Sequence, residues 1–140
     1  MRLMIDANII VDILCKREPF YEESAMISKL CETEIVDGHI TALTFANIVY
    51  IMRKEIDAEK IVTMLNILSR IFHIESLTLA DLNTAASLQW NDFEDAIQEA
   101  IAERIKADMI ITRNGSDYNG SKITVKTPTE FVKEIAKKTL

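Results

Sequence analysis

Three aspartates in this sequence stand beside strand-like runs, where they could meet in one acidic site. Asp6 directly follows the run over residues 2–5, Asp117 follows the run over residues 109–112, and Asp95 begins a helical pattern that leads into that second run. Carboxylates about 4 Å apart repel each other by about 1 kcal/mol in water and by about 4 kcal/mol at an effective dielectric of about 20. Such a group therefore needs a cation or protonation. Oxygen donors suit Mg²⁺ or Mn²⁺ better than Zn²⁺, and such an ion promotes phosphodiester hydrolysis.

Each acid also has an ordinary structural explanation. Acids in the first turn of a helix, such as Asp92 and Glu94, are favoured by the positive end of the helix dipole. Asp6 could cap the helix that follows it, and Asp117 could be a turn residue in a loop that contains glycine. The structural explanation is weakest for Asp95, because this residue leads into the apolar face of its helix and a buried, unpaired acid is costly.

The elements that must position these acids alternate along the chain. Strands are expected over residues 2–5, 39–42, 72–74, 109–112 and 123–125, and helices over 8–14, 20–31, 44–54, 58–70, 78–88, 91–107 and from 127 onward. This alternation predicts an α/β fold with a central, mostly parallel sheet of four to five short strands. Ligands of such sheets bind beyond the carboxyl ends of the strands. The polar residues expected at that edge are Asp6, Asn47, Asp92, Glu94, Asp95, Thr112, Asn114 and Asp117.

The composition indicates one globular domain over residues 1–140. Hydrophobic residues make up 49% of the chain and charged residues 27%, which excludes a disordered or low-complexity protein. No run approaches the roughly 20 apolar residues of a membrane span. Cys15 and Cys31 lack the spacing of a metal or redox pair, so we expect free thiols in a reducing compartment. These features predict a cytoplasmic protein with no membrane partner.

The net charge of −6 argues against a broad grip on nucleic acid through phosphate neutralisation. Arg113 and Lys122 flank the loop that carries Asp117, however, and could form a modest basic rim for an RNA strand. His39 and His73 lie in predicted strands without an obvious partner, and we interpret them as structural. The sequence contains no dinucleotide-binding glycine motif, P-loop or nucleophile elbow. The helix over residues 58–70 is unusually apolar, which leaves open whether it is buried or forms an interface with a second copy or with a partner's helix.

Four segments resemble the motifs of PIN-domain nucleases, in that family's order and spacing over essentially the whole chain. They are Ile5-Asp6-Ala7-Asn8-Ile9-Ile10-Val11-Asp12, Asp92-Phe93-Glu94-Asp95-Ala96-Ile97, Ile111-Thr112-Arg113-Asn114-Gly115-Ser116-Asp117-Tyr118 and Thr127-Pro128-Thr129-Glu130-Phe131. The resemblance implies a PIN-like three-layer α/β/α fold. It also implies a metal-dependent endoribonuclease, most like the VapC-like toxins of bacterial and archaeal toxin–antitoxin pairs.

By the same resemblance, Asp6, Asp95 and Asp117 are the expected catalytic and metal-binding residues, with Mg²⁺ or Mn²⁺ as the cofactor. Asn8, Thr112 and Asn114 are expected to support them. These are listed by position in the matching motifs. The implied partners are an RNA substrate, a cognate antitoxin and a second copy of the chain in a homodimer.

The sequence departs from the family pattern at Asn47, where the second acid is expected. An amide oxygen can bind a metal, but it brings no negative charge and cannot act as a base. Asp92, one helical turn or less from Asp95, is the candidate for compensation. The departure motivates a second hypothesis, in which the chain is a catalytically weak or inactive RNA- or protein-binding module. A phosphatase or receiver-like domain is disfavoured, because Asp6-Ala7-Asn8 lacks the second aspartate of haloacid-type phosphatases.

Overall fold

The computed structural model describes residues 1–139 and contains a five-stranded sheet in which every paired neighbour is parallel. The strand order is β3-β2-β1-β4-β5. The strands are β1 (Arg2–Ile5), β2 (Asp37–Thr41), β3 (His73–Glu75), β4 (Met109–Ile111) and β5 (Thr124–Lys126). The predicted parallel sheet is therefore confirmed, and its central strand is the one that carries Asp6 at its carboxyl end.

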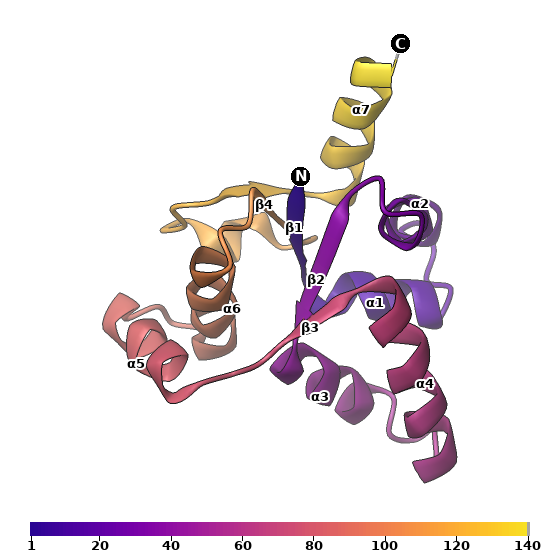
Figure 1. Cartoon of the computed structure of the whole chain (residues 1–140), viewed down its shortest axis with the longest axis horizontal. Helices are drawn as coiled ribbons and strands as arrows, with labels where there is room; N and C mark the ends of the chain where they lie inside the picture. The colour runs from indigo at the N-terminus through magenta and orange to yellow at the C-terminus, as the bar shows by residue number, and fades with distance from the viewer. Residues whose placement is uncertain (140) are drawn as a thin grey trace.

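Within residues 1–139, six α-helices and one 3₁₀ turn connect the strands, and a seventh α-helix follows β5 (Figure 1). They are α1 (Ala7–Leu14), α2 (Tyr21–Glu32), α3 (Ala42–Ile51), α4 (Ala58–Ile71), α5 (Leu79–Leu88), α6 (Phe93–Arg104), η1 (Gly115–Tyr118) and α7 (Pro128–Thr139). Figure 1 shows α5 and α6 on one side of the strands and α1, α2 and α4 on the other. This arrangement is the three-layer α/β/α fold.

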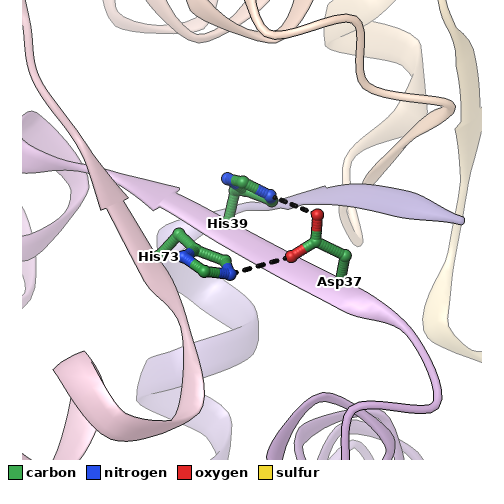
Figure 2. A group of neighbouring side chains, drawn as sticks. All are labelled: Asp37, His39 and His73. Carbon is green, nitrogen blue, oxygen red and sulfur yellow. Dashed lines mark ion pairs between the residues drawn. The ribbon is translucent and has the colours of Figure 1, made fainter.

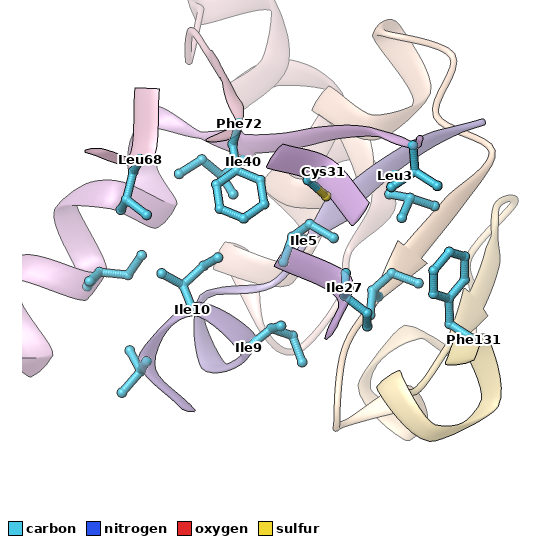
Figure 3. Close-up of a cluster of buried hydrophobic side chains, with 14 of the residues drawn as sticks. Leu3, Ile5, Ile9, Ile10, Ile27, Cys31, Ile40, Leu68, Phe72 and Phe131 are labelled. Carbon is cyan, nitrogen blue, oxygen red and sulfur yellow. The ribbon is translucent and has the colours of Figure 1, made fainter. Parts of the chain in front are cut away.

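Alternating side chains of the central strands supply both layers of the core, as parallel strands covered on both faces require. Leu3 and Ile5 of β1 pack with α1, α2, α4 and α7 in one cluster, which Figure 3 shows. Met4 points the other way and packs with α5 and α6. All three side chains are fully buried, so β1 is fixed from both sides and its carboxyl end has a defined position.

Two predicted helices were wrong by two or three residues at each end: the structure has α3 over Ala42–Ile51 and α6 over Phe93–Arg104. The helix expected over residues 44–54 begins at Ala42, because Thr41 is the N-cap and its hydroxyl accepts a hydrogen bond from the Thr44 N–H. The helix expected over residues 91–107 ends at Arg104, and Lys106 then takes a left-handed backbone conformation. Both shifts affect elements that border the acidic site.

Cys15 is exposed, Cys31 is buried, and both are free thiols. Among residues 1–139, no helix combines the length and the apolar character needed to cross a membrane.

Candidate functional site

A polar cavity of about 280 Å³ opens beyond the carboxyl ends of β1 and β2, beside the start of α6 and the loop after β4. Eight of the nine polar residues singled out from the sequence line it: Asp6, Asn8, Asn47, Asp92, Glu94, Asp95, Asn114 and Asp117. Thr112 does not line the cavity, but its hydroxyl contacts Asp6. The parallel sheet thus brings together side chains that are more than 100 residues apart in the chain.

Asp6 is held on both carboxylate oxygens. Its Oδ1 accepts a hydrogen bond from the Ala7 N–H at 2.8 Å, so Asp6 is indeed the N-cap of α1. Its Oδ2 accepts a second from the Thr112 hydroxyl at 2.7 Å, and that hydroxyl accepts in turn from the Asn114 N–H at 3.1 Å. Burial raises the pKa of Asp6, and the nearby charge of Asp92 raises it further against these hydrogen bonds. Capping and a place in the cavity are therefore compatible.

Asp95 lies in the first turn of α6 and faces the same cavity. Its pKa is raised to about 7, first by burial and then by the charge of Asp92, with smaller contributions from Asp6 and Asp117. The Tyr118 hydroxyl donates a hydrogen bond to Asp95 Oδ1 at 3.1 Å and opposes this shift. Asp95 is thus partly protonated at neutral pH unless a cation joins the group.

A buried hydrogen-bonded chain behind the acids fixes Tyr118. The Gln98 side chain donates from Nε2 to the Tyr118 hydroxyl at 2.6 Å, while its Oε1 accepts from the Thr44 hydroxyl at 3.4 Å. Burial and then the charges of Asp6 and Asp95 hold the pKa of Tyr118 far above its ordinary value, so this phenol stays a neutral donor. Sequence reasoning assigned no role to Gln98 or Thr44. The sequence could have indicated them only through their positions on the buried faces of their helices.

Asn47 contacts an acid that sequence reasoning treated as a helix-end residue. Its Nδ2 donates a hydrogen bond to Glu94 Oε2 at 3.0 Å, and both side chains line the cavity. Asp92, the expected compensating acid, instead caps α6 by accepting a hydrogen bond from the Asp95 N–H at 3.0 Å. Glu94 therefore supplies a carboxylate beside the position where Asn47 lacks one.

The cavity is acidic throughout. Five of its lining residues are carboxylic acids, and none of the lining residues within the described part of the chain is Lys, Arg or His. The carboxylic acids are Asp6, Asp92, Glu94, Asp95 and Asp117. This all-oxygen donor set, in which burial raises the pKa values of Asp6 and Asp95, fits Mg²⁺ or Mn²⁺ better than a metal that prefers nitrogen or sulfur.

The two basic residues that flank the loop of Asp117 do not line the cavity. Arg113 turns away, and its Nε lies 2.7 Å from Oδ2 of the fully buried Asp12, with its guanidinium 4.0 Å from the ring centre of Phe20. Lys122 lies beside Glu103, with Nζ 4.0 Å from that carboxylate. Arg113 therefore neutralises a buried acid next to the site.

Comparison with known families identifies the family of this chain. The chain matches the model of the PIN domain over residues 2–116. It belongs to the PIN domain family. No curated protein sequence matches it. The match covers β1 to β4, the first two PIN-like segments and most of the third, whereas Asp117 and the segment Thr127–Phe131 lie beyond its end.

Solved structures share this PIN fold at low sequence identity. VapBC2 from Rickettsia felis, bound to a DNA fragment from its promoter, is 16% identical with a TM-score of 0.66, over 91% of this chain and 98% of that one. A toxin–antitoxin complex from Klebsiella pneumoniae is 22% identical with a TM-score of 0.68, over 90% and 97%. VapC20 from Mycobacterium tuberculosis, described as a sarcin–ricin loop cleaving toxin, is 11% identical with a TM-score of 0.61, over 77% and 86%.

Proposed function

We propose that this PIN domain is a metal-dependent endoribonuclease and the toxin of a toxin–antitoxin pair. The observation that carries the proposal is the acidic cavity, in which five carboxylic acids from distant parts of the chain converge beyond the ends of the strands. Family membership and the toxins among the structures of like fold support it. The two free thiols favour action in the cytoplasm.

Asp6, Asp95 and Asp117 would hold Mg²⁺ or Mn²⁺, with Glu94 as a further acid. A bound ion of this kind would polarise a phosphodiester, lower the pKa of water and offset charge on the leaving oxygen. The Thr112 hydroxyl holds Asp6 Oδ2, and the Tyr118 hydroxyl holds Asp95 Oδ1. Without positive charge, five acids would exclude an RNA phosphate. Metal binding and substrate binding are therefore coupled through these side chains.

The proposed partners are an RNA strand, an antitoxin protein and a second copy of the chain. The descriptions of two similar structures support the antitoxin, since one is VapBC2 and the other is a toxin–antitoxin complex. Apolar side chains exposed on α3 and α4 support the protein contacts: Tyr50, Ile51, Val62, Leu65 and Ile67.

The test of the catalytic assignment is Asp6→Asn. This change keeps the size of the side chain and an oxygen that can cap α1, but it removes the negative charge. We expect RNA cleavage in Mg²⁺ to be lost, with the circular dichroism spectrum unchanged. Asp57→Asn is the matched control, because Asp57 caps α4 outside the cavity. Cleavage by Asp6→Asn at the rate of the unaltered protein would refute the assignment.

The test of metal binding is thermal unfolding with and without Mg²⁺ or Mn²⁺. An ion at about 100 times its dissociation constant adds roughly 2.7 kcal/mol to the free energy of unfolding. We expect this gain in the unaltered protein and a smaller one in Asp6→Asn. Equal gains in both would place the ion elsewhere.

Asn47 favours a second candidate function, a PIN domain that binds RNA or protein with little turnover. The variant Asn47→Glu distinguishes an active ribonuclease from a domain that binds RNA or protein with little turnover. A gain of cleavage would indicate a weakened site, whereas unchanged cleavage would indicate that Glu94 already supplies the necessary charge.

A further inference from the structure

Both histidines of the chain lie side by side on the sheet, away from the acidic cavity. His39 of β2 and His73 of β3 are direct register partners, and their rings stack with centroids 4.7 Å apart. Asp37, two residues before His39 and so on the same face of β2, reaches both rings (Figure 2). Its Oδ2 lies 3.0 Å from His39 Nε2, and its Oδ1 lies 3.0 Å from His73 Nε2.

Glu75 fixes the orientation of His39. Its Oε1 lies 2.6 Å from His39 Nδ1, so that ring nitrogen carries a proton and donates it to the carboxylate. The remaining nitrogen, Nε2, is buried in a residue that is only 6% exposed, and it has no hydrogen-bond partner in the described structure. It faces Asp37 Oδ2, but not along a hydrogen-bonding direction. Nε2 therefore lies beside a carboxylate oxygen with no hydrogen bond between them, and a cation bound to both atoms would supply the missing partner.

This pattern is typical of metal-binding histidines. Such histidines donate their second ring N–H to a carboxylate, which fixes the tautomer and leaves the other nitrogen free for the metal. Glu75 has that relation to His39. We propose that Asp37, His39 and His73 bind a divalent transition-metal ion, with Zn²⁺ as the leading candidate, at a site separate from the acidic cavity.

The spacing of the donor atoms suits a tetrahedral ion. One ligand atom from each of the three residues can be chosen so that all lie within 4.8 Å of one another. Zinc bonds of roughly 2.0–2.2 Å to nitrogen and oxygen place tetrahedral ligands roughly 3.4 Å apart. Each imidazole nitrogen lies 3.0 Å from a different oxygen of Asp37, His39 from Oδ2 and His73 from Oδ1. The His73 side chain is 68% exposed, so water can take the fourth position.

Two carboxylates beside the imidazoles, Asp37 and Glu75, can balance the charge of one divalent ion. Arg2 is the competing cation, with Nε 3.1 Å from Asp37 Oδ2. Oδ1 of Asp37 remains free of Arg2 and faces the exposed imidazole of His73.

The proposed site lies at the opposite end of β2 from the acidic cavity. Thr41, the last residue of β2, lines that cavity, whereas Asp37 is the first residue of the strand. Four residues of strand span roughly 13 Å. Because β3 is a three-residue strand at the edge of the sheet, an ion shared by Asp37 and His73 would fasten this edge to β2.

Zinc binding is measured by titration calorimetry on chelator-treated protein, with Mg²⁺ as the comparison ion. In the Asp6→Asn protein, whose acidic cavity binds metal weakly, we expect one Zn²⁺ per chain and a tetrahedral Co²⁺ absorption spectrum on substitution with cobalt. His73→Gln removes an exposed ligand, so the fold should persist while Zn²⁺ affinity falls roughly a hundredfold or more. Glu75→Gln should weaken binding by roughly ten- to a hundredfold, since it loosens the orientation of His39.

Two controls separate this site from the proposed nuclease. Asp6→Asn should leave Zn²⁺ affinity unchanged, because Asp6 belongs to the acidic cavity, and Glu34→Gln removes a nearby exposed acid outside the cluster. Absence of Zn²⁺ binding would overturn the proposal. So would equal affinity in His73→Gln, or nitrogen NMR shifts that show His39 as an imidazolium between Asp37 and Glu75 in the presence of Zn²⁺. None of these readouts depends on RNA cleavage.

Discussion

The carboxyl group of Asp95 is half-buried among other acids, and this environment disfavours its ionised form and raises its pKa to about 7. Burial is the largest cause, and the charge of Asp92 is the next. A bound cation would remove this cost by favouring the ionised form. A carboxyl group with a strongly raised pKa therefore lies in the cavity where we propose the metal.

The raised pKa of Asp95 predicts a pH-dependent stability in the absence of divalent ions. The folded protein keeps a proton that the unfolded chain releases near pH 3.8, so the contribution to folding is complete below that pH and is lost as the pH rises through about 7. Asp95→Asn, which cannot ionise, should therefore gain stability relative to the unaltered protein between pH 4 and 8. After allowance for solvent screening the gain is about 1–2 kcal/mol.

Urea unfolding in a chelating buffer at several pH values measures this difference. Asp57→Asn serves as the control, because Asp57 caps α4 and does not line the acidic cavity. A difference between Asp95→Asn and the unaltered protein that stays constant from pH 4 to pH 8 would contradict the prediction.

Asn47 is expected to act through Glu94, because its amide donates a hydrogen bond to that carboxylate. Asn47→Ala should lower Mg²⁺ affinity roughly three- to tenfold, as expected for the loss of one hydrogen bond of about 1 kcal/mol. Glu94→Gln should lower it more. Since both changes disrupt the same contact, the double variant should bind Mg²⁺ no more weakly than Glu94→Gln alone. Additive losses would show that Asn47 acts independently.

Most polar residues of the cavity could be predicted from the sequence, but the contacts between their side chains could not. Asp6, Asp95 and Asp117 could be found because they follow strands or begin a helix that leads into one. The contact between Asn47 and Glu94 could not, since it depends on how α3 and α6 pack across the sheet. The pairing of His39 with His73 was likewise missed, because it depends on the register of β2 against β3.

Gly38 of β2 is where the sheet and α2 come closest. A Cβ atom at this position would lie 2.5 Å from Cys31 Sγ and 2.9 Å from Phe72 Cδ1. Gly38→Ala should therefore lower the free energy of unfolding by about 1–3 kcal/mol through overpacking. Thermal or urea unfolding measures the loss.

Gly115→Ala is the matched control for Gly38→Ala, since the nearest atom to its added Cβ is Val125 Cγ1 at 3.9 Å. The double variant Gly38→Ala with Cys31→Ala removes the Sγ contact and should recover part of the stability. If Gly115→Ala and Gly38→Ala lowered stability equally, the close approach of β2 and α2 would be refuted.

Element types were predictable from apolar periodicity, while their ends depended on single side chains. Thr78 was correctly identified as the start of α5, because the capping box with Asp81 is local in sequence. Thr41 was missed as the cap of α3, since a strand residue and a cap residue occupy the same position. A capping residue could therefore be predicted where a loop precedes the helix, but not where a strand leads directly into it.

The exposed apolar side chains of α4 bear on the assembly of the whole molecule. Sequence reasoning left its burial open, and the structure buries Met64 and Leu68 but exposes Val62, Leu65 and Ile67. If this face joins two copies, Val62→Lys should shift the sedimentation coefficient from that of a dimer toward that of a monomer. Leu79→Lys changes an equally exposed apolar residue on α5 and should have no effect. A monomer in the unaltered protein would refute the proposed homodimer.

At the level of the whole fold, the α/β class followed from the alternation of strands and helices. The strand order did not, because it depends on which crossovers bury both faces of β1. Placing β1 between β2 and β4 is what makes one edge of the sheet collect acids from both halves of the chain.

The central position of β1 also affects how the protein is synthesised. Asp6 leaves the ribosome early, yet the Thr112 hydroxyl that holds it is encoded 106 residues later. Until β4 and the loop beyond it have emerged, the nascent chain keeps its acids apart and presents no assembled nuclease centre. A toxin of this design would be harmless to the ribosome that translates it for most of that translation, and its partner would have that interval in which to arrive.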